Sequence, residues 1–208
     1  MATIVSTMFV SLDGVAEIDP AWHFPYFDDN MGKAVTEDYA DVDVLILGRV
    51  TYDSFAGAWP DRETAGEVDA EFAKDLGDLR KVVATRSVDS DEELGWRNAE
   101  RTDDVVATAT ALRDDAGVGK VLVAGSISVV RQLIDAGLLD ELRLLVHPVA
   151  ARHGERLFGE SDEVRPLKLL RSEVFPTGVV RLIYAPADLP KTTGAGDVTD
   201  KVPGAGDD

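Results

Sequence analysis

The chain has 208 residues, a formal net charge of −18 and 45% hydrophobic residues. This length suits one buried domain, and the negative charge argues against nucleic acid and anionic membranes as partners. The absence of cysteine excludes disulfides, thiol nucleophiles and the zinc-thiolate site of a nucleobase deaminase. Because no segment resembles a signal peptide or reaches membrane-spanning length, we expect a cytoplasmic protein that acts on a small molecule without a metal.

The first predicted strand covers residues 3–12 and ends in the turn-prone pair Asp13-Gly14. An irregular loop follows, and it carries a group of aromatic side chains, namely Trp22, His23, Phe24, Tyr26 and Phe27. Aromatic residues gathered in a loop indicate either ligand contact or a loop anchored to the core by its own side chains. The sequence leaves both interpretations open.

Three later apolar segments, residues 42–47, 82–84 and 121–124, are each followed by glycine, hydroxyl or arginine residues. These are Gly48, Arg49 and Thr51, then Thr85, Arg86 and Ser87, then Gly125, Ser126 and Ile127. Ligands bind at the carboxyl ends of strands in open α/β sheets, and helix starts and arginines bind phosphate. The repetition predicts a nucleotide cofactor, although each segment alone is also typical of an ordinary strand-to-helix corner.

The remaining periodicity predicts helices over residues 28–40, 63–76, 103–113 and 127–136, and strands over residues 141–149, 167–175 and 179–184. Pro176-Thr177-Gly178 joins the last two strands as a hairpin. Strands that alternate with helices and then close in a hairpin predict an α/β fold. We expect a mainly parallel mixed sheet with an antiparallel C-terminal hairpin and helices on both faces.

The C-terminal segment differs in composition from the rest of the chain. Residues 187–208 are rich in glycine, proline and acidic residues. Such a segment buries too little apolar surface to offset the entropy of ordering it. We therefore expect one domain over residues 1–186 and a disordered acidic tail over residues 187–208.

Several motifs in order resemble a known family. They are Met8-Phe-Val-Ser-Leu-Asp-Gly14, Gly48-Arg-Val-Thr-Tyr52, Ala124-Gly-Ser126, Gly137-Leu-Leu-Asp-Glu-Leu142, His147-Pro-Val149 and Arg156-Leu-Phe158. The chain is similar to the dihydrofolate reductase-like family, and within it to the C-terminal reductase domain of the bacterial riboflavin-biosynthesis deaminase-reductase. The resemblance covers residues 2–185. It implies the three-layer dihydrofolate reductase-like fold.

The resemblance also implies NADPH as the cofactor, lying along the carboxyl ends of the central strands. It places the pyrophosphate at Gly125, Ser126 and Ile127, where a helix starts. Further phosphate contacts fall to Arg49 and Thr51, next to Gly48. The adenosine 2′-phosphate falls to Thr85, Arg86 and Ser87, and an arginine at this place favours NADP over NAD.

The chain departs from the family where the substrate would bind. In folate reductases an acidic residue after the aromatic loop recognises the pterin, but alignment from Trp22 puts Phe27 there and Asp28 one position later. We expect Trp22 and Phe27 to contact substrate, and Asp13 or Asp28 to donate or orient the proton. A turn role for Asp13 and a helix-capping role for Asp28 remain open. Residues 149–154 also lack the family's glycine-rich turn.

Taken with the residues, the resemblance implies an NADPH-dependent reductase of a small heterocyclic or carbonyl substrate, similar to the phosphoribosylaminouracil reductase of riboflavin biosynthesis. One alternative is a reductase of dihydrofolate or another pterin. Another is a nucleotide-binding protein without catalysis. A homodimer is expected, because reductase domains of this type commonly pair.

Overall fold

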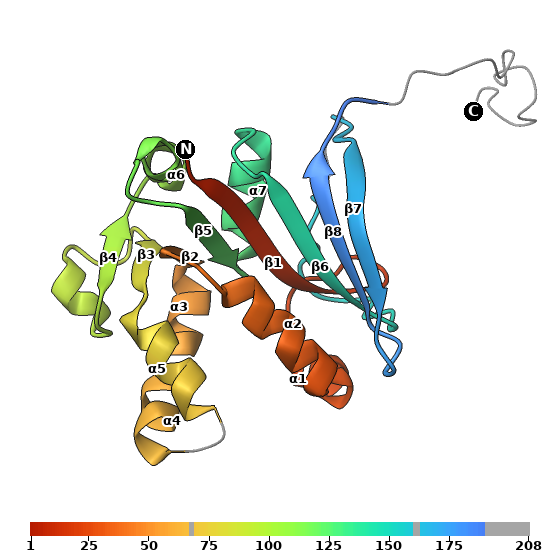
Figure 1. Ribbon diagram of the computed structural model, residues 1–208, viewed down its shortest axis with the longest axis horizontal. Helices are drawn as coiled ribbons and strands as arrows, with labels where there is room; N and C mark the ends of the chain where they lie inside the picture. Colours follow the sequence, from red (N-terminus) through yellow and green to blue (C-terminus); the bar gives the residue numbers. More distant parts are fainter. Residues whose placement is uncertain (67–68, 160–162, 190–208) are drawn as a thin grey trace, which may run out of the picture.

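The computed structural model describes residues 1–66, 69–159 and 163–189. Its strands are β1 (Thr3–Ser11), β2 (Val44–Gly48), β3 (Arg80–Ala84), β4 (Ala99–Thr102), β5 (Lys120–Ala124), β6 (Glu141–His147), β7 (Leu167–Val174) and β8 (Val180–Pro186). They form one sheet in the order β4-β3-β2-β5-β1-β6-β8-β7 (Figure 1). In this order, the five neighbouring pairs from β4 across to β6 are parallel. Strand β8 pairs antiparallel with both β6 and β7. The predicted mainly parallel sheet with an antiparallel C-terminal hairpin is confirmed.

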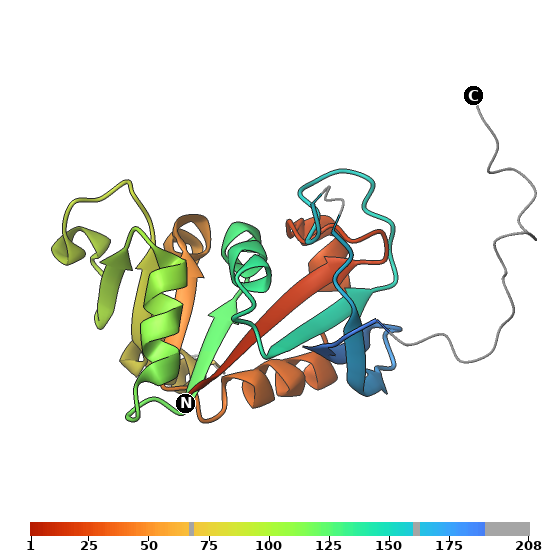
Figure 2. The same ribbon diagram turned by 90° about the horizontal axis from the view of Figure 1, so that it is seen from above.

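The helices are α1 (Pro20–His23), α2 (Asp29–Tyr39), α3 (Arg49–Ala56), α4 (Trp59–Ala65), α5 (Ala70–Asp78), α6 (Val105–Asp114) and α7 (Ile127–Asp135), with short 3-10 turns at Phe24–Tyr26 and Asp91–Leu94. Residues of α6 and α7 share one apolar core with the sheet, and those of α3 and α5 share another with its opposite face. Figure 2 shows α2 and α7 on opposite sides of β1. The described chain therefore has helices on both faces, as predicted.

The central strand β2 shows why this architecture follows from the sequence. Val44 and Ile46 pack in the core under α6 and α7, while Leu45 and Leu47 pack in the core under α3 and α5. A strand buried on both faces needs an unbroken apolar run rather than an alternating one. Its polar chemistry is consequently confined to its carboxyl end, where Gly48 leads into α3.

Four details differ from the sequence-based expectation. The loop predicted to be irregular after the first strand contains α1 and the 3-10 turn at Phe24–Tyr26. The single helix predicted over residues 63–76 is two helices, α4 and α5, because Gly66 ends α4 in the left-handed region at φ 66°. The helix predicted over residues 103–113 begins two residues later, at Val105, because its N-cap is Asp104, whose side chain accepts from Ala107 N. Strand β4 was not predicted, because Ala99–Thr102 is short, only half-buried and lacks an apolar run.

A fully buried lysine joins α5 to β3. The ammonium of Lys81 donates to the carbonyl oxygens of Leu76, Gly77 and Leu79 at 3.0, 2.8 and 2.6 Å, and lies 4.5 Å from the ring centre of Trp96. These carbonyls end α5 and have no partner within the helix, so the lysine satisfies them. Burial lowers the pKa of Lys81 to about 8.

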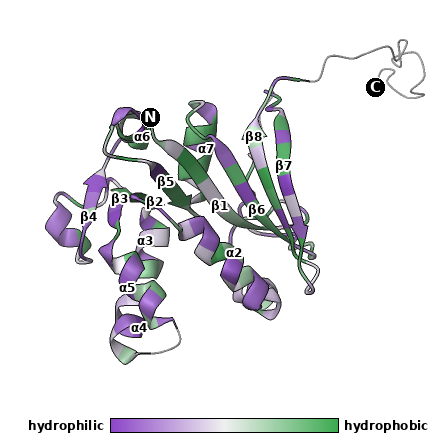
Figure 3. Cartoon of the chain, in the orientation of Figure 1, coloured by the Kyte–Doolittle hydropathy of each residue, from purple (hydrophilic) through white to green (hydrophobic). Residues whose placement is uncertain are grey.

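The edge strand β7 is the exposed end of the sheet. Every residue of β7 is exposed, including the apolar Leu167, Leu169, Leu170 and Val174. Figure 3 shows β7 with both hydrophobic and hydrophilic stretches along its length. Beyond β8, Ala187 N still donates to Pro166 O at 3.1 Å. The tail predicted over residues 187–208 lies outside the described residues from position 190 onward. Within the described ranges, no helix combines the length and apolar character needed to cross a membrane.

Candidate active site

A cleft of about 2390 Å³ runs along the carboxyl ends of β2, β3 and β5 and beside β1. It is lined by all nine residues that the sequence predicts for the cofactor, namely Gly48, Arg49, Thr51, Thr85, Arg86, Ser87, Gly125, Ser126 and Ile127. These residues come from three segments of the sequence. The parallel sheet brings them together because its strands all end at the same edge.

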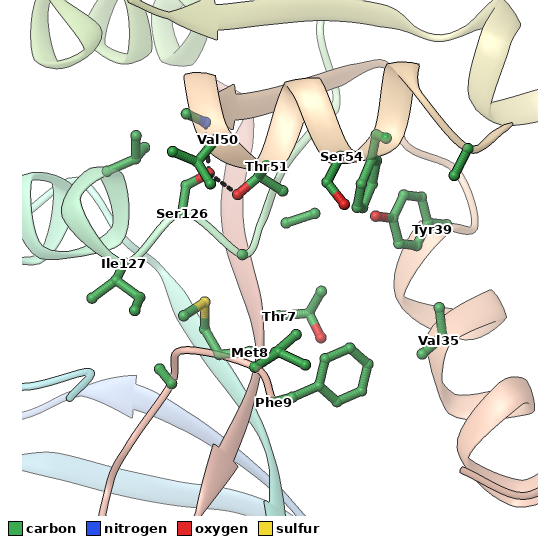
Figure 4. A pocket seen from close by; sticks show the side chains of 18 of the residues that line it. Thr7, Met8, Phe9, Val35, Tyr39, Val50, Thr51, Ser54, Ser126 and Ile127 are labelled. Carbon is green, nitrogen blue, oxygen red and sulfur yellow. Dashed lines mark hydrogen bonds between the residues drawn. The ribbon is translucent and has the colours of Figure 1, made fainter. Parts of the chain in front are cut away.

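A hydrogen-bonded corner, made of Gly48, Thr51 and Ser126, joins β2 to α7. Gly48 N donates to Ser126 Oγ at 2.6 Å, and Ser126 Oγ donates to Thr51 Oγ1 at 2.8 Å (Figure 4). A Cβ atom at Gly48 would lie 3.0 Å from Ser126 Oγ and 3.1 Å from Ser126 Cβ. A side chain at this position would therefore require Ser126, and with it the start of α7, to shift by a few tenths of an ångström.

The start of α7 is open toward the cleft. Gly125 and Ser126 both have φ of 62°, in the left-handed region, which a serine rarely adopts. Ser126 is the N-cap of α7, but its hydroxyl bonds the hydrogen-bonded corner and does not cap the helix. The first N–H groups of α7 thus have no side-chain cap, and a helix start of this kind binds anions.

Two arginines line the same half of the cleft. Arg49 donates from Nε to both carboxylate oxygens of Asp53 at 2.8 Å, while its Nη1 is buried without a hydrogen-bond partner. Arg86 is exposed and forms no ion pair within the described part of the chain. An unpartnered buried donor is rare in folded proteins, so Nη1 of Arg49 indicates a ligand oxygen at this place.

Asp13 lies outside the cleft lining. Its carboxylate accepts from Ser11 Oγ at 2.6 Å and from the backbone N–H groups of Ala151 and Arg152 at 2.9 Å. These bonds lower the pKa of Asp13 to about 2, and the bond from Ser11 has the largest effect. The carboxylate is ionised at neutral pH, and it fastens residues 149–154 to the end of β1.

Asp28 is also absent from the cleft lining, and it caps α2. Its carboxylate accepts from Asn30 Nδ2 at 3.0 Å and from Met31 N at 2.9 Å, and both bonds lower its pKa. Trp22 is not among the lining residues either, whereas Phe27 is. Of the four substrate-side predictions, the structure brings only Phe27 to the cleft.

His23 lies at the cleft and was not among the predicted site residues. It ends α1, which begins where the Asp19 side chain accepts from Ala21 N at 2.8 Å and Pro20 occupies the first turn. Its Nδ1 lies 3.2 Å from Nε2 of His147, which is 124 positions away and fully buried in β6. Burial, and then His147, lower the pKa of His23 to about 4. No local sequence signal reveals a pair so distant in the chain.

The cleft continues between α2 and the helices α3 to α5. Tyr39, Phe55, Trp59 and Phe72 line this extension, with Tyr39 and Trp59 each 5.2 Å from Phe72 between ring centres. In Figure 4 the hydroxyls of Tyr39 and Ser54 point toward one another across the opening. These residues come from four helices, and their spacing is typical of ordinary core positions, so the sequence does not single them out.

The arrangement contains hydrogen-bond donors and cations on one side and aromatic rings on the other. The described part of the chain has no cluster of three or more His, Asp or Glu that could hold a metal ion. The residues present therefore suit a ligand with anionic groups and a planar part, bound between strand ends and helix starts.

The sheet is mainly parallel, ends in an antiparallel hairpin and has helices on both faces, with a cleft along its strand ends. This is the architecture of the dihydrofolate reductase-like class of α/β proteins. The chain belongs to the RibD C-terminal domain family, whose model matches residues 2–181. The family resemblance predicted from the motifs is confirmed.

Individual relatives are distant. The uncharacterized protein YyaP of Bacillus subtilis is 26% identical over 186 residues, covering 87% of this chain and 93% of that protein. A pyrimidine reductase-like protein from Corynebacterium diphtheriae matches with a TM-score of 0.63 at 15% identity, over 90% of this chain and 92% of that one. RibD from Acinetobacter baumannii matches with a TM-score of 0.61 at 16% identity, over 90% of this chain and 59% of that one. These structures share the fold.

Proposed function

We propose that the protein is an NADPH-dependent reductase of a small heterocyclic or carbonyl substrate. The observation that carries the proposal is the meeting of the hydrogen-bonded corner, the uncapped start of α7 and two arginines at one edge of the sheet. Membership of a reductase-like domain family supports the same reaction class. The phosphoribosylaminouracil reductase reaction is the nearest model for the chemistry.

The proposed cofactor contacts follow from the donors in the cleft. The N–H groups at the start of α7 and the buried Nη1 of Arg49 would bind the pyrophosphate. Arg86, with Thr85 and Ser87 beside it, would bind the adenosine 2′-phosphate. NADPH supplies the hydride when bound. The protein's part is then to orient the two reactants and exclude water.

We assign the proton of the reduction to solvent. Asp13 and Asp28 are ionised, engaged by backbone N–H groups and outside the cleft lining, so each has a structural role that accounts for its position. Phe27 stands where folate reductases carry their acidic residue, and it lines the cleft with an apolar ring. This favours a neutral heterocycle or carbonyl compound over dihydrofolate.

Titration calorimetry with NADPH and NADH, followed by a turnover panel, tests the proposal. We expect NADPH to bind at least tenfold more tightly than NADH. We also expect NADPH oxidation with a ribosylaminopyrimidinedione or a small carbonyl compound. Equal affinities would remove the assignment of Arg86. Efficient turnover of dihydrofolate would favour a pterin reductase, and tight binding without any turnover would favour a nucleotide-binding protein without catalysis.

We also propose that two copies pair through β7. This edge strand exposes all eight of its residues, and Leu169 and Leu170 are each about half exposed. An unpaired apolar edge of this kind is a site of association between chains. Light scattering on Leu169→Glu tests the pairing: a shift from dimer to monomer is expected, and a wild type that is monomeric at all concentrations overturns it.

A further inference from the structure

The imidazole of His23 presents one ring nitrogen without a protein partner. The side chain is 5% exposed and lines the cleft. Its Nδ1 is engaged by His147, and no group in the described residues bonds its Nε2. The fully enclosed polar atoms that lack a partner do not include Nε2 of His23, so this nitrogen is open to the cleft and free to bond a ligand there.

The tautomers of both histidines are assigned from the carbonyl nearest to Nδ1 of His147, that of Leu145; the backbone carbonyl of Val10 also contacts this ring. Nδ1 of His147 lies 3.1 Å from Leu145 O, and a carbonyl oxygen can only accept, so this nitrogen carries the hydrogen. A neutral imidazole has one N–H, so Nε2 of His147 is an acceptor. In this assignment, Nδ1 of His23 donates to it across 3.2 Å. The remaining nitrogen of His23, Nε2, then has a lone pair and no hydrogen.

The surroundings keep this pair neutral and apolar. Burial lowers the pKa of His23 and also that of His147. An aromatic wall, made of Phe9, His23, Phe24 and Phe27, lines the cleft at this place. The ring of His23 lies 4.5 Å from that of Phe9, 5.2 Å from Phe24 and 5.7 Å from Phe27, between ring centres. Phe24 is 64% and Phe27 45% exposed, so part of each ring is open to a planar ligand.

We propose that Nε2 of His23 determines substrate specificity by accepting a hydrogen bond from an N–H group of a planar heterocycle packed against the aromatic wall. The inference rests on the proposed function in taking this half of the cleft as the substrate side. It adds the chemical requirement that the heterocycle present a donor, because an acceptor-only edge would oppose the lone pair of Nε2.

The first test reads the tautomer directly in the full-length protein. The chain has three histidines, so long-range proton–nitrogen NMR resolves each ring. The His153→Gln variant identifies the exposed histidine and leaves the buried pair intact. We expect Nδ1-protonated, neutral rings for both His23 and His147 at neutral pH. A hydrogen on Nε2 of His23 overturns the proposal.

The second test uses a matched pair of probes. Uracil presents ring N–H donors, whereas dimethyluracil, with both ring nitrogens methylated, presents none. We expect uracil to shift the Nε2 resonance of His23 in the direction of an accepted hydrogen bond, and dimethyluracil to leave it in place. A response to both probes, or to neither, overturns the proposal.

Two substitutions separate hydrogen bonding from packing. His23→Leu removes the acceptor and should weaken uracil binding about five- to tenfold. His23→Gln places an amide oxygen near the position of Nε2 and should bind uracil within about threefold of the wild type. Thermal melts show whether each variant folds. Equal weakening in both variants, with folding retained, would reduce His23 to a packing residue.

NADPH titration of the wild type tests separately whether the protein binds the proposed cofactor. NADPH binding without a uracil response overturns the assignment of His23 alone. A uracil response without NADPH binding overturns the cofactor assignment and leaves the role of His23 standing.

Discussion

The hydrogen-bonded corner and the aromatic wall face the same cleft but are built differently. The corner joins the end of β2 to the start of α7 through two hydrogen bonds of Ser126 Oγ, from Gly48 N at 2.6 Å and to Thr51 Oγ1 at 2.8 Å. The parallel sheet fixes its place. The wall combines Phe9 of β1 with three residues of the short segment after β1, and it is held by ring contacts and one histidine pair. The corner therefore tolerates little change, whereas the wall can change its chemistry without altering the sheet.

Gly48→Val should give the largest effect, because it breaks the corner. Its Cβ would lie 3.0 Å from Ser126 Oγ, so the start of α7 must move. Overpacking of this kind costs about 1–3 kcal/mol of folding stability. We expect the displaced helix start also to weaken NADPH binding, by roughly a hundredfold where about 3 kcal/mol falls on the bound state. Calorimetry measures the affinity. Gly159→Ala is the control, since its nearest atoms lie at 3.9 Å, and it should bind NADPH normally. Normal affinity in Gly48→Val would show that the corner does not hold cofactor.

Arg86→Ala tests the other cofactor contact proposed at the strand ends, the one to the 2′-phosphate. Loss of one charge-assisted contact to the 2′-phosphate is worth about 1.5–3 kcal/mol, so NADPH affinity should fall about ten- to a hundredfold while NADH affinity stays unchanged. Titration of both cofactors measures the difference. Arg80 begins β3, at the opposite end from Arg86, and pairs with Glu100. Arg80→Ala should alter neither affinity, and a parallel loss of NADH binding in Arg86→Ala would contradict the assignment.

The aromatic wall should respond to pH, since it contains a titratable group and the corner contains none. The pKa of His23 is lowered from 6.5 to about 4, so between these values the unfolded chain binds a proton that the folded protein excludes. The stability contributed by the neutral ring is complete above pH 6.5 and is lost as the pH falls toward 4. We expect His23 to account for about 1–2 kcal/mol of this loss.

Urea unfolding across this pH window measures the effect. The wild type should lose more stability than His23→Gln, while His153→Gln should follow the wild type because its imidazole is exposed. Parallel curves for the wild type and His23→Gln would show that the buried pair does not oppose protonation.

Truncation after Ala187 should have the smallest effect on either half of the cleft. The hydrogen bond from Ala187 N to Pro166 O is retained, and the removed composition favours few buried contacts. Melting temperature and NADPH affinity should stay within error of the full-length values. A drop of several degrees would place residues 188–208 against the domain and move the predicted domain boundary.

The two halves also differ in how far the sequence predicted them. Gly48, Arg49 and Ser126 follow apolar runs directly, so local patterns place them at strand ends and the parallel sheet brings them together. Phe27 was predicted from the resemblance. The partnership of His23 with His147 depends on a contact between β6 and the segment after β1, which no local pattern encodes. Asp13 and Asp28 were ambiguous for the same reason, because a carboxylate in a turn has the same signature whether it caps a backbone or contacts a ligand.

The buried ammonium of Lys81 provides a chemical reporter of the folded state. Amine-reactive reagents acylate neutral, accessible amines, so Lys33, Lys74 and Lys168 at the surface will be labelled while Lys81 is enclosed by α5 and Trp96. Modification of Lys81 requires the contact between α5 and β3 to open. The rate of its labelling, followed by mass spectrometry of the peptide that contains it, therefore measures how often the domain opens under native conditions.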